Sequence, residues 1–304
     1  MAGPSNYDDI GIDLTRQNIQ TAVQGAASQA CIAPQGFAAA FLGMAGVISP
    51  EDRAVIVGIA EDLALVPPAH VEVDHDIRIA LAGGLAGQEG IALIAGTGSA
   101  CYGRRADGRE WRCGGWGSLL DDLGSAYDLG RQSLVTLIRS VDGRGEDSEL
   151  SAAVMQKLGI TDPDQILRRI YHDGLSRFEI AALAPCVTGA AARGDPAACR
   201  IIRNGADELA LLVETTSRLL DMPAQRPLVT LIGGLVESAE IFHRALQAAI
   251  HGRLPEARIA APHLPPVLGA GLLSLHRLGV ETTAELVARL KRDWENAQHG
   301  LGEV

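Results

Sequence analysis

Four consecutive residues carry the chemical groups that hold a phosphate: Gly96, Thr97, Gly98 and Ser99. They follow the apolar run IALIA and precede SACYG, and both segments are typical of strands. The glycines let backbone amides approach an anion closely, and the two hydroxyl groups can donate to it. The segment therefore predicts a phosphate-binding turn between two strands. An ordinary glycine-rich hairpin would give the same pattern.

A carboxylate follows another predicted strand. Residues 70–76 read HVEVDHD and end in Asp76, at the position where open α/β sheets present groups to ligands. A carboxylate there could accept the proton of an attacking hydroxyl group. A helix-capping aspartate would explain the same position.

A third group of candidate residues lies in CGGWGSLLDD. Gly115 frees the backbone beside Trp116, whose flat apolar ring suits the face of a sugar. Asp121 and Asp122 offer acceptors for sugar hydroxyl groups. The alternative places Trp116 in the core and the two acids at a helix N-terminus.

Two small-residue pairs occur near the end of the chain. Gly233 and Gly234 follow the strand-like run LVTLI, and Gly269 and Ala270 occur where a later helix begins. Both pairs allow a ligand to approach the backbone closely, although a glycine pair after a strand is also typical of a plain turn.

The elements that must position these residues alternate between short apolar runs and helical stretches, which predicts a mixed α/β protein with parallel strands. Asp107-Gly108 predicts a hairpin turn, and residues 117–221 carry mainly helical signals. Expected strands begin near residues 37, 70, 90, 227 and 257, and expected helices begin after Ser49, Asp76, Ser176, Ser238, Leu264 and Thr282, the last with Glu285 as its capping partner.

Composition narrows the classes of partner. The chain has 304 residues, is 47% hydrophobic and carries a formal net charge of -11. This acidity argues against a nucleic-acid partner. Five cysteines without a CxxC pair, and no export signal or membrane-spanning run, predict reduced thiols and a cytoplasmic protein without a membrane partner.

The ordered set HD, AGTGS, GGWG, D-x-G-S-A-Y, GG and PPVLGA resembles the BadF/BadG/BcrA/BcrD-type ATPase family, and within it N-acetylglucosamine and glucosamine kinases. GPSNY and LGMAGVISPEDR are similar to family segments in the same order. The resemblance implies a two-domain ribonuclease H-like fold of the actin/hexokinase type. Its expected parts are a first domain at 1–89, a second domain with a helical insertion at 90–281, and a terminal helix at 282–304 that packs back on the first domain.

The resemblance also implies roles for these residues in an ATP-dependent amino-sugar kinase. Asp76 would be the general base for the sugar 6-hydroxyl, and Mg2+ would arrive with ATP without an assigned protein ligand. A homodimer is expected from the same resemblance. The implied contacts are Gly96, Thr97, Gly98 and Ser99 with phosphate; Asn6, Thr97, Gly115, Trp116 and Asp122 with sugar; and Gly233, Gly234, Gly269 and Ala270 with the nucleotide.

Three departures from the family pattern keep alternatives open. The family opens with a strand, a DGGGTKT-like loop and two more strands, whereas GPSNY here begins at Gly3. We therefore expect an incomplete first domain, in which the strand from Phe37 exposes an edge and an apolar face. Leu123 replaces a common Glu, and no cysteine motif for an iron–sulfur cluster is found. The alternatives are a non-catalytic sugar-binding relative and a partner-coupled ATPase.

Overall fold

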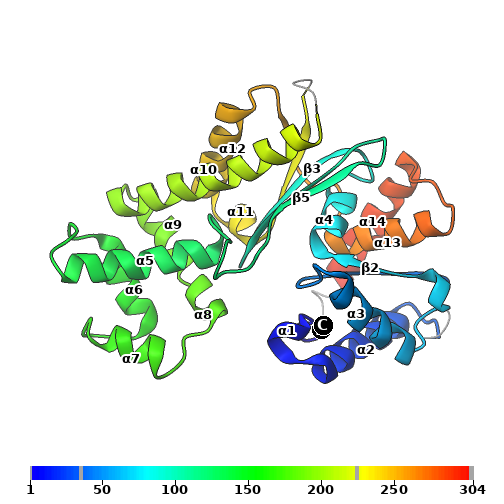
Figure 1. The fold of residues 1–304 in the computed structure, drawn as a ribbon, viewed down its shortest axis with the longest axis horizontal. Coiled ribbons are helices and arrows are strands. Elements are labelled where there is room, and N and C mark those ends of the chain that lie inside the picture. Colours follow the sequence, from blue (N-terminus) through cyan, green and yellow to red (C-terminus); the bar gives the residue numbers. More distant parts are fainter. Residues whose placement is uncertain (1, 34–36, 223–225, 301–304) are drawn as a thin grey trace. The chain divides into compact units, whose positions relative to one another are not determined.

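The computed structural model describes residues 2–33, 37–222 and 226–300 (Figure 1). The chain forms two compact units, of which unit 1 comprises residues 1–88 and 262–304 and unit 2 comprises residues 89–261. Residues 262–281 were expected in the second domain, and instead they group with unit 1. Residues 301–304 of the expected terminal helix lie outside the described residues.

Unit 1 is built on two parallel strands, β1 (Ala40–Met44) and β2 (Val71–His75), which pair from Ala40 opposite Val71 to Met44 opposite His75. Each strand leads into a helix, as the sequence pattern predicts. The helices of unit 1 are α1 (Tyr7–Ile10), α2 (Ile12–Gln29), α3 (Pro50–Asp62), α4 (Asp76–Gly84), α13 (Pro266–Arg277) and α14 (Ala284–Gly300), with a short 3-10 turn at Pro68–His70.

The start of α3 follows directly from its sequence. Ser49 accepts a hydrogen bond from the Asp52 amide, the Asp52 side chain accepts one from the Ser49 amide, and Pro50 occupies the first helical position. Among the described residues β1 pairs with β2 alone. The prediction that this strand exposes an apolar face is wrong, because Phe41 and Met44 of β1 are only 7% and 6% exposed.

Helix α13 belongs to unit 1 because it packs closely on α4. A Cβ at Gly83 would lie 2.7 Å from the Pro265 carbonyl oxygen, and one at Gly269 would overlap the Ile79 carbonyl oxygen. These two glycines therefore allow the helix backbones to approach each other. The cap of α14 is one residue later than predicted, since Thr283 Oγ1 accepts from the Leu286 amide.

Unit 2 is built on a mixed sheet with the strand order β5-β4-β3-β6-β7. The central strands β3 and β6 run parallel, from Ile91 opposite Val229 to Ile94 opposite Ile232, and β4 and β5 form an antiparallel meander with β3. The predicted Asp107-Gly108 turn connects β4 to β5. The strands are β3 (Gly90–Ala95), β4 (Ser99–Arg104), β5 (Glu110–Gly114), β6 (Leu228–Ile232) and β7 (Arg258–Ala260).

Helices pack against this sheet and extend beyond it. The long helix α10 contacts β3, β4 and β5, and the helices between β5 and α10 form the predicted helical region (Figure 1). Ser176 and Glu179 form a capping box at the predicted helix start, although the helix that they begin has only 5 residues. The helices are α5 (Ala126–Val141), α6 (Glu149–Leu158), α7 (Gln165–Tyr171), α8 (Arg177–Ala181), α9 (Ala184–Ala192), α10 (Pro196–Leu219), α11 (Gly234–Ser238) and α12 (Glu240–Arg253).

The remaining sequence expectations concern thiols and membranes. All five cysteines are free thiols, and Cys101 is fully buried. Within the described part of the chain, every helix is too short or too polar to cross a bilayer.

Candidate active site

The carboxyl ends of the paired parallel strands β3 and β6 bring two predicted glycine segments together in unit 2. Gly96 follows β3, and Gly233 follows β6. A Cβ at Gly233 would lie 2.6 Å from the Ala95 carbonyl oxygen and 3.1 Å from the Gly96 amide nitrogen. Gly233 also has a φ of 118°, which favours glycine. The two segments thus form one surface at the edge where α/β sheets bind ligands.

The predicted phosphate turn is fastened to the start of α5. The Gly96 and Thr97 carbonyl oxygens accept from the amides of Ala126 and Tyr127, at 2.8 and 3.2 Å. Ser125 caps the same helix by accepting from the Asp128 amide. The first amides of α5 are therefore used to hold the turn, which keeps its shape before any ligand binds.

Ser99 and Asp122 fasten the other end of the turn. The Ser99 amide donates to Asp122 Oδ1 at 2.9 Å, and the Ser99 hydroxyl donates to the Leu123 carbonyl oxygen at 3.1 Å. Both side chains are buried. In this conformation the Ser99 hydroxyl serves the loop, and Thr97 carries the more accessible hydroxyl of the turn.

Asp122 is held by an arginine that no motif had indicated. Arg177 Nη2, at the start of α8, donates to Asp122 Oδ2 at 2.8 Å. Burial raises the pKa of the Asp122 carboxyl, and the Ser99 amide and the Arg177 guanidinium only partly offset this effect. Both oxygens of Asp122 therefore already have protein partners, whereas the resemblance had assigned this carboxylate to a sugar.

The loop after β5 exposes the aromatic candidate. Gly114, Gly115 and Gly117 all have positive φ, and the Trp116 side chain between them is 60% exposed. The Arg112 guanidinium lies 4.8 Å from the centre of the Trp116 ring. The alternative that buried Trp116 in the core is wrong, and the ring is available as an apolar surface.

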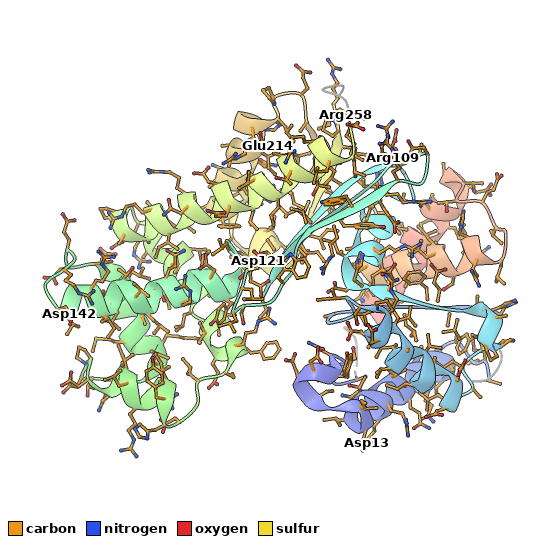
Figure 2. All side chains as sticks on the ribbon, viewed as in Figure 1. Asp13, Arg109, Asp121, Asp142, Glu214 and Arg258 are labelled. Atoms are coloured by element: carbon orange, nitrogen blue, oxygen red, sulfur yellow. The ribbon has the colours of Figure 1, made fainter. Side chains whose placement is uncertain are left out.

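Asp121, the other acid of this loop, supports the backbone beside Trp116. Its Oδ2 accepts from the Trp116 amide at 3.4 Å. Figure 2 labels Asp121 near the start of α5 and Asp142 at the other end of that helix. Asp121 therefore lies near the end of α5 that contacts the glycine turn.

In unit 1 the remaining candidates lie at a similar edge, where the parallel strands β1 and β2 end. Asp76 is the first residue of α4, directly after β2, and is partly exposed. Asn6 caps α1, since its Oδ1 accepts from the Asp8 amide at 3.2 Å. A Cβ at Gly46, just after β1, would lie 2.5 Å from that same oxygen. Asn6 and Asp76 therefore occur beside the ends of neighbouring strands.

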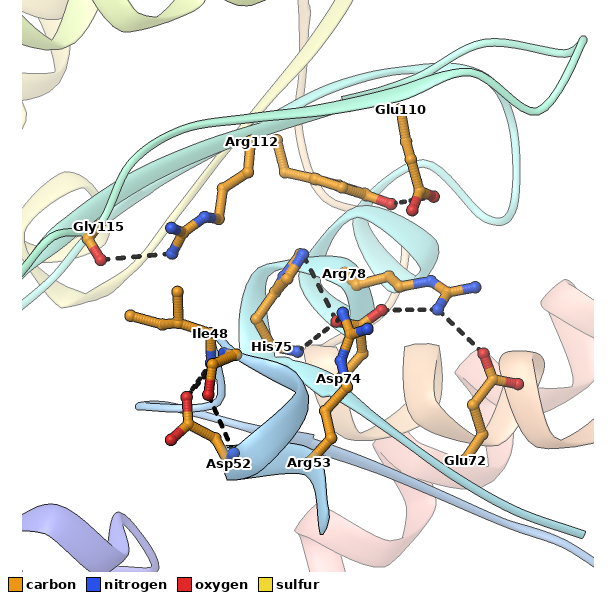
Figure 3. A network of polar contacts seen from close by, with 12 residues as sticks. Ile48, Asp52, Arg53, Glu72, Asp74, His75, Arg78, Glu110, Arg112 and Gly115 are labelled. Atoms are coloured by element: carbon orange, nitrogen blue, oxygen red, sulfur yellow. Dashed lines mark hydrogen bonds and ion pairs between the residues drawn. The ribbon is translucent and has the colours of Figure 1, made fainter. Parts of the chain in front are cut away.

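An ion-pair cluster centred on the buried Asp74 supports the turn that carries Asp76 (Figure 3). Asp74 is 3% exposed and accepts from Arg53 and Arg78, each at 2.7 Å, and from the His75 amide at 2.9 Å. Burial by itself would raise the pKa of the Asp74 carboxyl, but the surrounding His75, Arg78 and Arg53 groups hold that pKa below its usual value. Asp74 thus fixes the backbone two residues before the predicted base.

A second hydrogen bond fastens the segment after Asn6. The Tyr7 hydroxyl donates to Asp52 Oδ1, and Asp52 Oδ2 accepts from the amides of Ile48 and Ser49. The first of these bonds raises the pKa of Tyr7 to about 12 and holds the pKa of Asp52 far below its usual value. The GPSNY segment is therefore connected to the start of α3.

The predicted residues fall into two groups. Unit 2 contains Gly96, Thr97, Gly98, Ser99, Gly115, Trp116, Asp122, Gly233 and Gly234, and unit 1 contains Asn6, Asp76, Gly269 and Ala270. Gly269 faces the backbone of α4, so the lack of a side chain there serves helix packing. Ala270 is the next residue of α13, where its carbonyl oxygen accepts from the Ser274 hydroxyl.

Sequence reasoning missed Asp74 and Arg177. Asp74 lies on a predicted strand two residues before Asp76, and a charged residue within a buried strand was a usable signal. Arg177 is separated from Asp122 by 55 residues, and no local pattern connects the two. For metals, the described residues include no group of three or more His, Cys, Asp or Glu side chains placed to hold an ion.

Several known proteins are similar to this chain in sequence and in fold. The chain is 29% identical over 272 residues to the N-acetylmuramic acid/N-acetylglucosamine kinase of Clostridium acetobutylicum, covering 90% of this chain and 88% of that protein. It is 29% identical to the N-acetyl-D-glucosamine kinase of Dictyostelium discoideum, covering 77% and 74%. A solved structure from Chromobacterium violaceum, named as a candidate N-acetylglucosamine kinase, gives a TM-score of 0.73 at 26% identity and covers 90% and 88%.

These similarities define an α/β protein with the actin/hexokinase-type fold found in sugar kinases, which confirms the predicted fold class. Residues 1–274 match the BadF/BadG/BcrA/BcrD ATPase family, and the chain belongs to this family.

Proposed function

We propose that this protein is an ATP-dependent kinase that phosphorylates an amino sugar, N-acetylglucosamine or a related sugar such as N-acetylmuramic acid, at its 6-hydroxyl group. One observation carries the proposal. The turn at Gly96–Ser99 and the Gly233–Gly234 pair meet at the carboxyl ends of β3 and β6, in a chain similar to kinases named for these sugars.

In this mechanism the turn at Gly96–Ser99 binds the phosphates of ATP, with Mg2+ entering on the nucleotide. Thr97 is the hydroxyl of the turn that is accessible to a ligand. Gly234, where a Cβ would meet no atom within 4 Å, leaves room for the nucleotide beside the turn. Binding thus relies on backbone amides and open space, as phosphoryl transfer depends mainly on positioning and charge stabilisation.

The sugar half of the mechanism assigns roles to three side chains and one backbone segment. Asp76 accepts the proton of the 6-hydroxyl as that oxygen attacks the γ-phosphorus, and the bond from this phosphorus to the bridging oxygen of ADP breaks. The exposed ring of Trp116 offers an apolar face to the sugar. Asn6 and Gly115 are the proposed polar contacts, through the Asn6 amide group and the Gly115 backbone.

The direct test is a coupled assay of ADP release with a panel of amino sugars, together with mass spectrometry of the products. We expect a phosphate ester on N-acetylglucosamine or N-acetylmuramic acid, formed in proportion to the ADP released. ADP release without a phosphorylated sugar would identify an ATPase instead. Sugar binding without ADP release would identify a non-catalytic binding protein.

A further inference from the structure

A cation lies against the aromatic ring that the proposed function assigns to the sugar. The Arg112 guanidinium lies over the Trp116 ring, 4.8 Å from its centre. Its Nη1 donates to the Gly115 carbonyl oxygen at 3.4 Å (Figure 3). Trp116 nevertheless remains 60% exposed, and Arg112 itself is half-buried. A sugar ring that packs on the exposed part of Trp116 would therefore lie beside a positive charge.

The position of Arg112 on β5 directs its side chain away from α10. A Cβ at Gly103, which pairs with Trp111, would lie 2.7 Å from Thr216 Cγ2 of α10, and Cys113 also interacts with Thr216. Side chains alternate along a strand, so Trp111 and Cys113 are on the face toward α10, and Arg112 between them is on the opposite face. The strand therefore holds the guanidinium on that face, just before the loop after β5.

The two acids of the same loop are directed at backbone amides. Asp121 Oδ2 accepts from the Trp116 amide at 3.4 Å, and Asp122 Oδ1 accepts from the Ser99 amide at 2.9 Å. These carboxylates stabilise the backbone around the loop. Arg112 thus provides the positive charge at the Trp116 ring.

A carboxylate on the ligand matches this cation. A planar guanidinium can donate two parallel N–H groups to a carboxylate, and such charge-assisted pairs are shorter and stronger than a bond to a neutral carbonyl. The bond from Arg112 to Gly115 is long for an N–H group and an oxygen, so a ligand carboxylate would compete well for the guanidinium. N-acetylmuramic acid carries a carboxylate on its 3-O-lactyl group, whereas N-acetylglucosamine is neutral.

We propose that Arg112 is a specificity-determining residue that binds the carboxylate of an acidic amino sugar whose ring packs on Trp116. The inference rests on the proposed function, because it names the substrate class that the same sugar site prefers. N-acetylmuramic acid is favoured over N-acetylglucosamine, since only the acidic sugar makes the contact with the guanidinium.

The test compares N-acetylmuramic acid with its methyl ester, which has nearly the same size and lacks the charge. We expect kcat/KM of the wild-type chain to be about 10- to 100-fold higher for the acid, as for the loss of one charge-assisted contact. Arg112→Gln should remove this preference by lowering kcat/KM mainly for the acid. Arg112→Lys keeps the charge and should restore part of the preference.

Arg109→Gln is the matched control on the same hairpin. Arg109 lies just before β5, at the end of the strand away from Trp116, where it pairs with the exposed Asp107 and Asp221. The acid-to-ester ratio of kcat/KM should not change in this variant. Because Arg112→Gln also removes the cation from the Trp116 ring, it should cause a small loss with both sugars, so the ratio is the decisive quantity.

Three results would overturn the inference. Equal kcat/KM for the acid and the ester in the wild-type chain would show that the carboxylate makes no favourable contact. An acid preference that persists in Arg112→Gln would assign it to another residue. A higher KM for ATP in Arg112→Gln, with the same acid-to-ester ratio, would place the guanidinium at a phosphate of the nucleotide instead.

Calorimetry of sugar binding separates this inference from the proposed kinase activity. Wild-type chain that phosphorylates no amino sugar refutes the activity, whereas tighter binding of the acid than of the ester, lost in Arg112→Gln, would still support the carboxylate contact. Phosphorylation of N-acetylglucosamine together with an acid-to-ester ratio near one refutes the carboxylate contact alone. Wild-type chain that binds no amino sugar overturns both.

Discussion

Asp74 in unit 1 and Asp122 in unit 2 are both buried next to arginine and a backbone amide, but the pKa values of the two carboxyls are shifted in opposite directions. Asp74 accepts from two arginines and the His75 amide, and its pKa is lowered. Asp122 accepts from one arginine and the Ser99 amide, and its pKa is raised. Desolvation raises both pKa values, so the neighbouring charges decide the net direction: His75, Arg78 and Arg53 lower the pKa of Asp74, whereas Asp121 adds to the increase at Asp122.

The two aspartates therefore have different structural roles. Asp74 is a fully satisfied anchor that stabilises the turn before Asp76. Asp122 is held less favourably as an anion, because the Ser99 amide and Arg177 only partly offset its burial. In the proposed mechanism, unit 1 supplies the base, and unit 2 supplies the phosphate-binding turn.

The largest expected effect concerns the residue that the unit 1 centre positions. Asp76→Asn removes the proposed proton acceptor, and kcat for sugar phosphorylation should fall about 10²- to 10⁴-fold, while the Kd for ATP stays within about twofold. Steady-state kinetics and calorimetry measure the two quantities. Asp62→Asn, which loses only a surface ion pair with Arg16, is the control. Retained turnover in Asp76→Asn would show that another group accepts the proton.

The second-largest expected effect is the loss of stability when Asp74 itself is removed. Asp74→Ala removes the buried carboxylate that Arg53 and Arg78 share. Because the Arg53 side chain is 47% exposed and Arg78 also pairs with Glu72, this change should destabilise unit 1 by about 2 kcal/mol. Hydrogen exchange measured separately for the amides of each unit would locate the loss. Replacing Asp62, which forms an exposed ion pair with Arg16, should lower the free energy of unfolding by no more than about 1 kcal/mol. Equal losses at the two sites would contradict the proposed anchor.

In unit 2 the corresponding test concerns backbone geometry. Gly233→Ala places a Cβ 2.6 Å from the Ala95 carbonyl oxygen at a φ of 118°, so it should cost about 1–3 kcal/mol and displace the turn at Gly96. ATP affinity should fall with it, as measured by calorimetry. Gly252→Ala in α12 is the matched control, because a Cβ there meets no atom within 4 Å and Gly252 has no role in the proposed site. An effect at Gly233 no larger than that at Gly252 would contradict the assigned contact between the two segments.

Local signals in the sequence were enough to predict most of the fold. The alternation of short apolar runs with helices predicted the strands that precede Asp76, Gly96 and Gly233, and capping signals at Ser49 and Ser176 predicted where α3 and α8 begin. Those features depend on neighbours within a few residues. They can therefore be predicted from the sequence without knowledge of the tertiary structure.

What the sequence could not predict depends on contacts between distant segments. Glycine at 269 has the same local appearance whether or not it packs against another helix, and the structure places it against the backbone of α4. Burial of Phe41 depends on helices that are remote in sequence. Arg177 approaches Gly98 only because α8 folds back onto the turn, which no spacing rule could indicate. Long-range packing thus determines contacts that the motifs do not reveal.

The smallest effect, and the most direct test of the contrast, is the pH dependence of stability. Because the pKa of Asp74 is lowered on folding, its ionised form stabilises unit 1 above the unfolded pKa of about 4, and this contribution is lost as pH falls through the lower folded pKa. Asp122 has the opposite sign. Its folded pKa is raised, so stability in unit 2 decreases as pH rises from the unfolded pKa of about 4 through the folded value.

Two substitutions separate these opposite slopes. Asp74→Asn should abolish part of the acid-induced loss of protection in unit 1, and Asp122→Asn should abolish part of the loss in unit 2 as pH rises above about 4, each by roughly 1 kcal/mol or less. Exchange rates of protected amides, corrected for their intrinsic pH dependence, measure both across pH 3 to 7. ATP should steepen the slope of unit 2, because a phosphate bound at the turn places further negative charge beside Asp122 and so disfavours its ionised form. An unchanged slope in the presence of saturating ATP would mean that no phosphate binds close to Asp122.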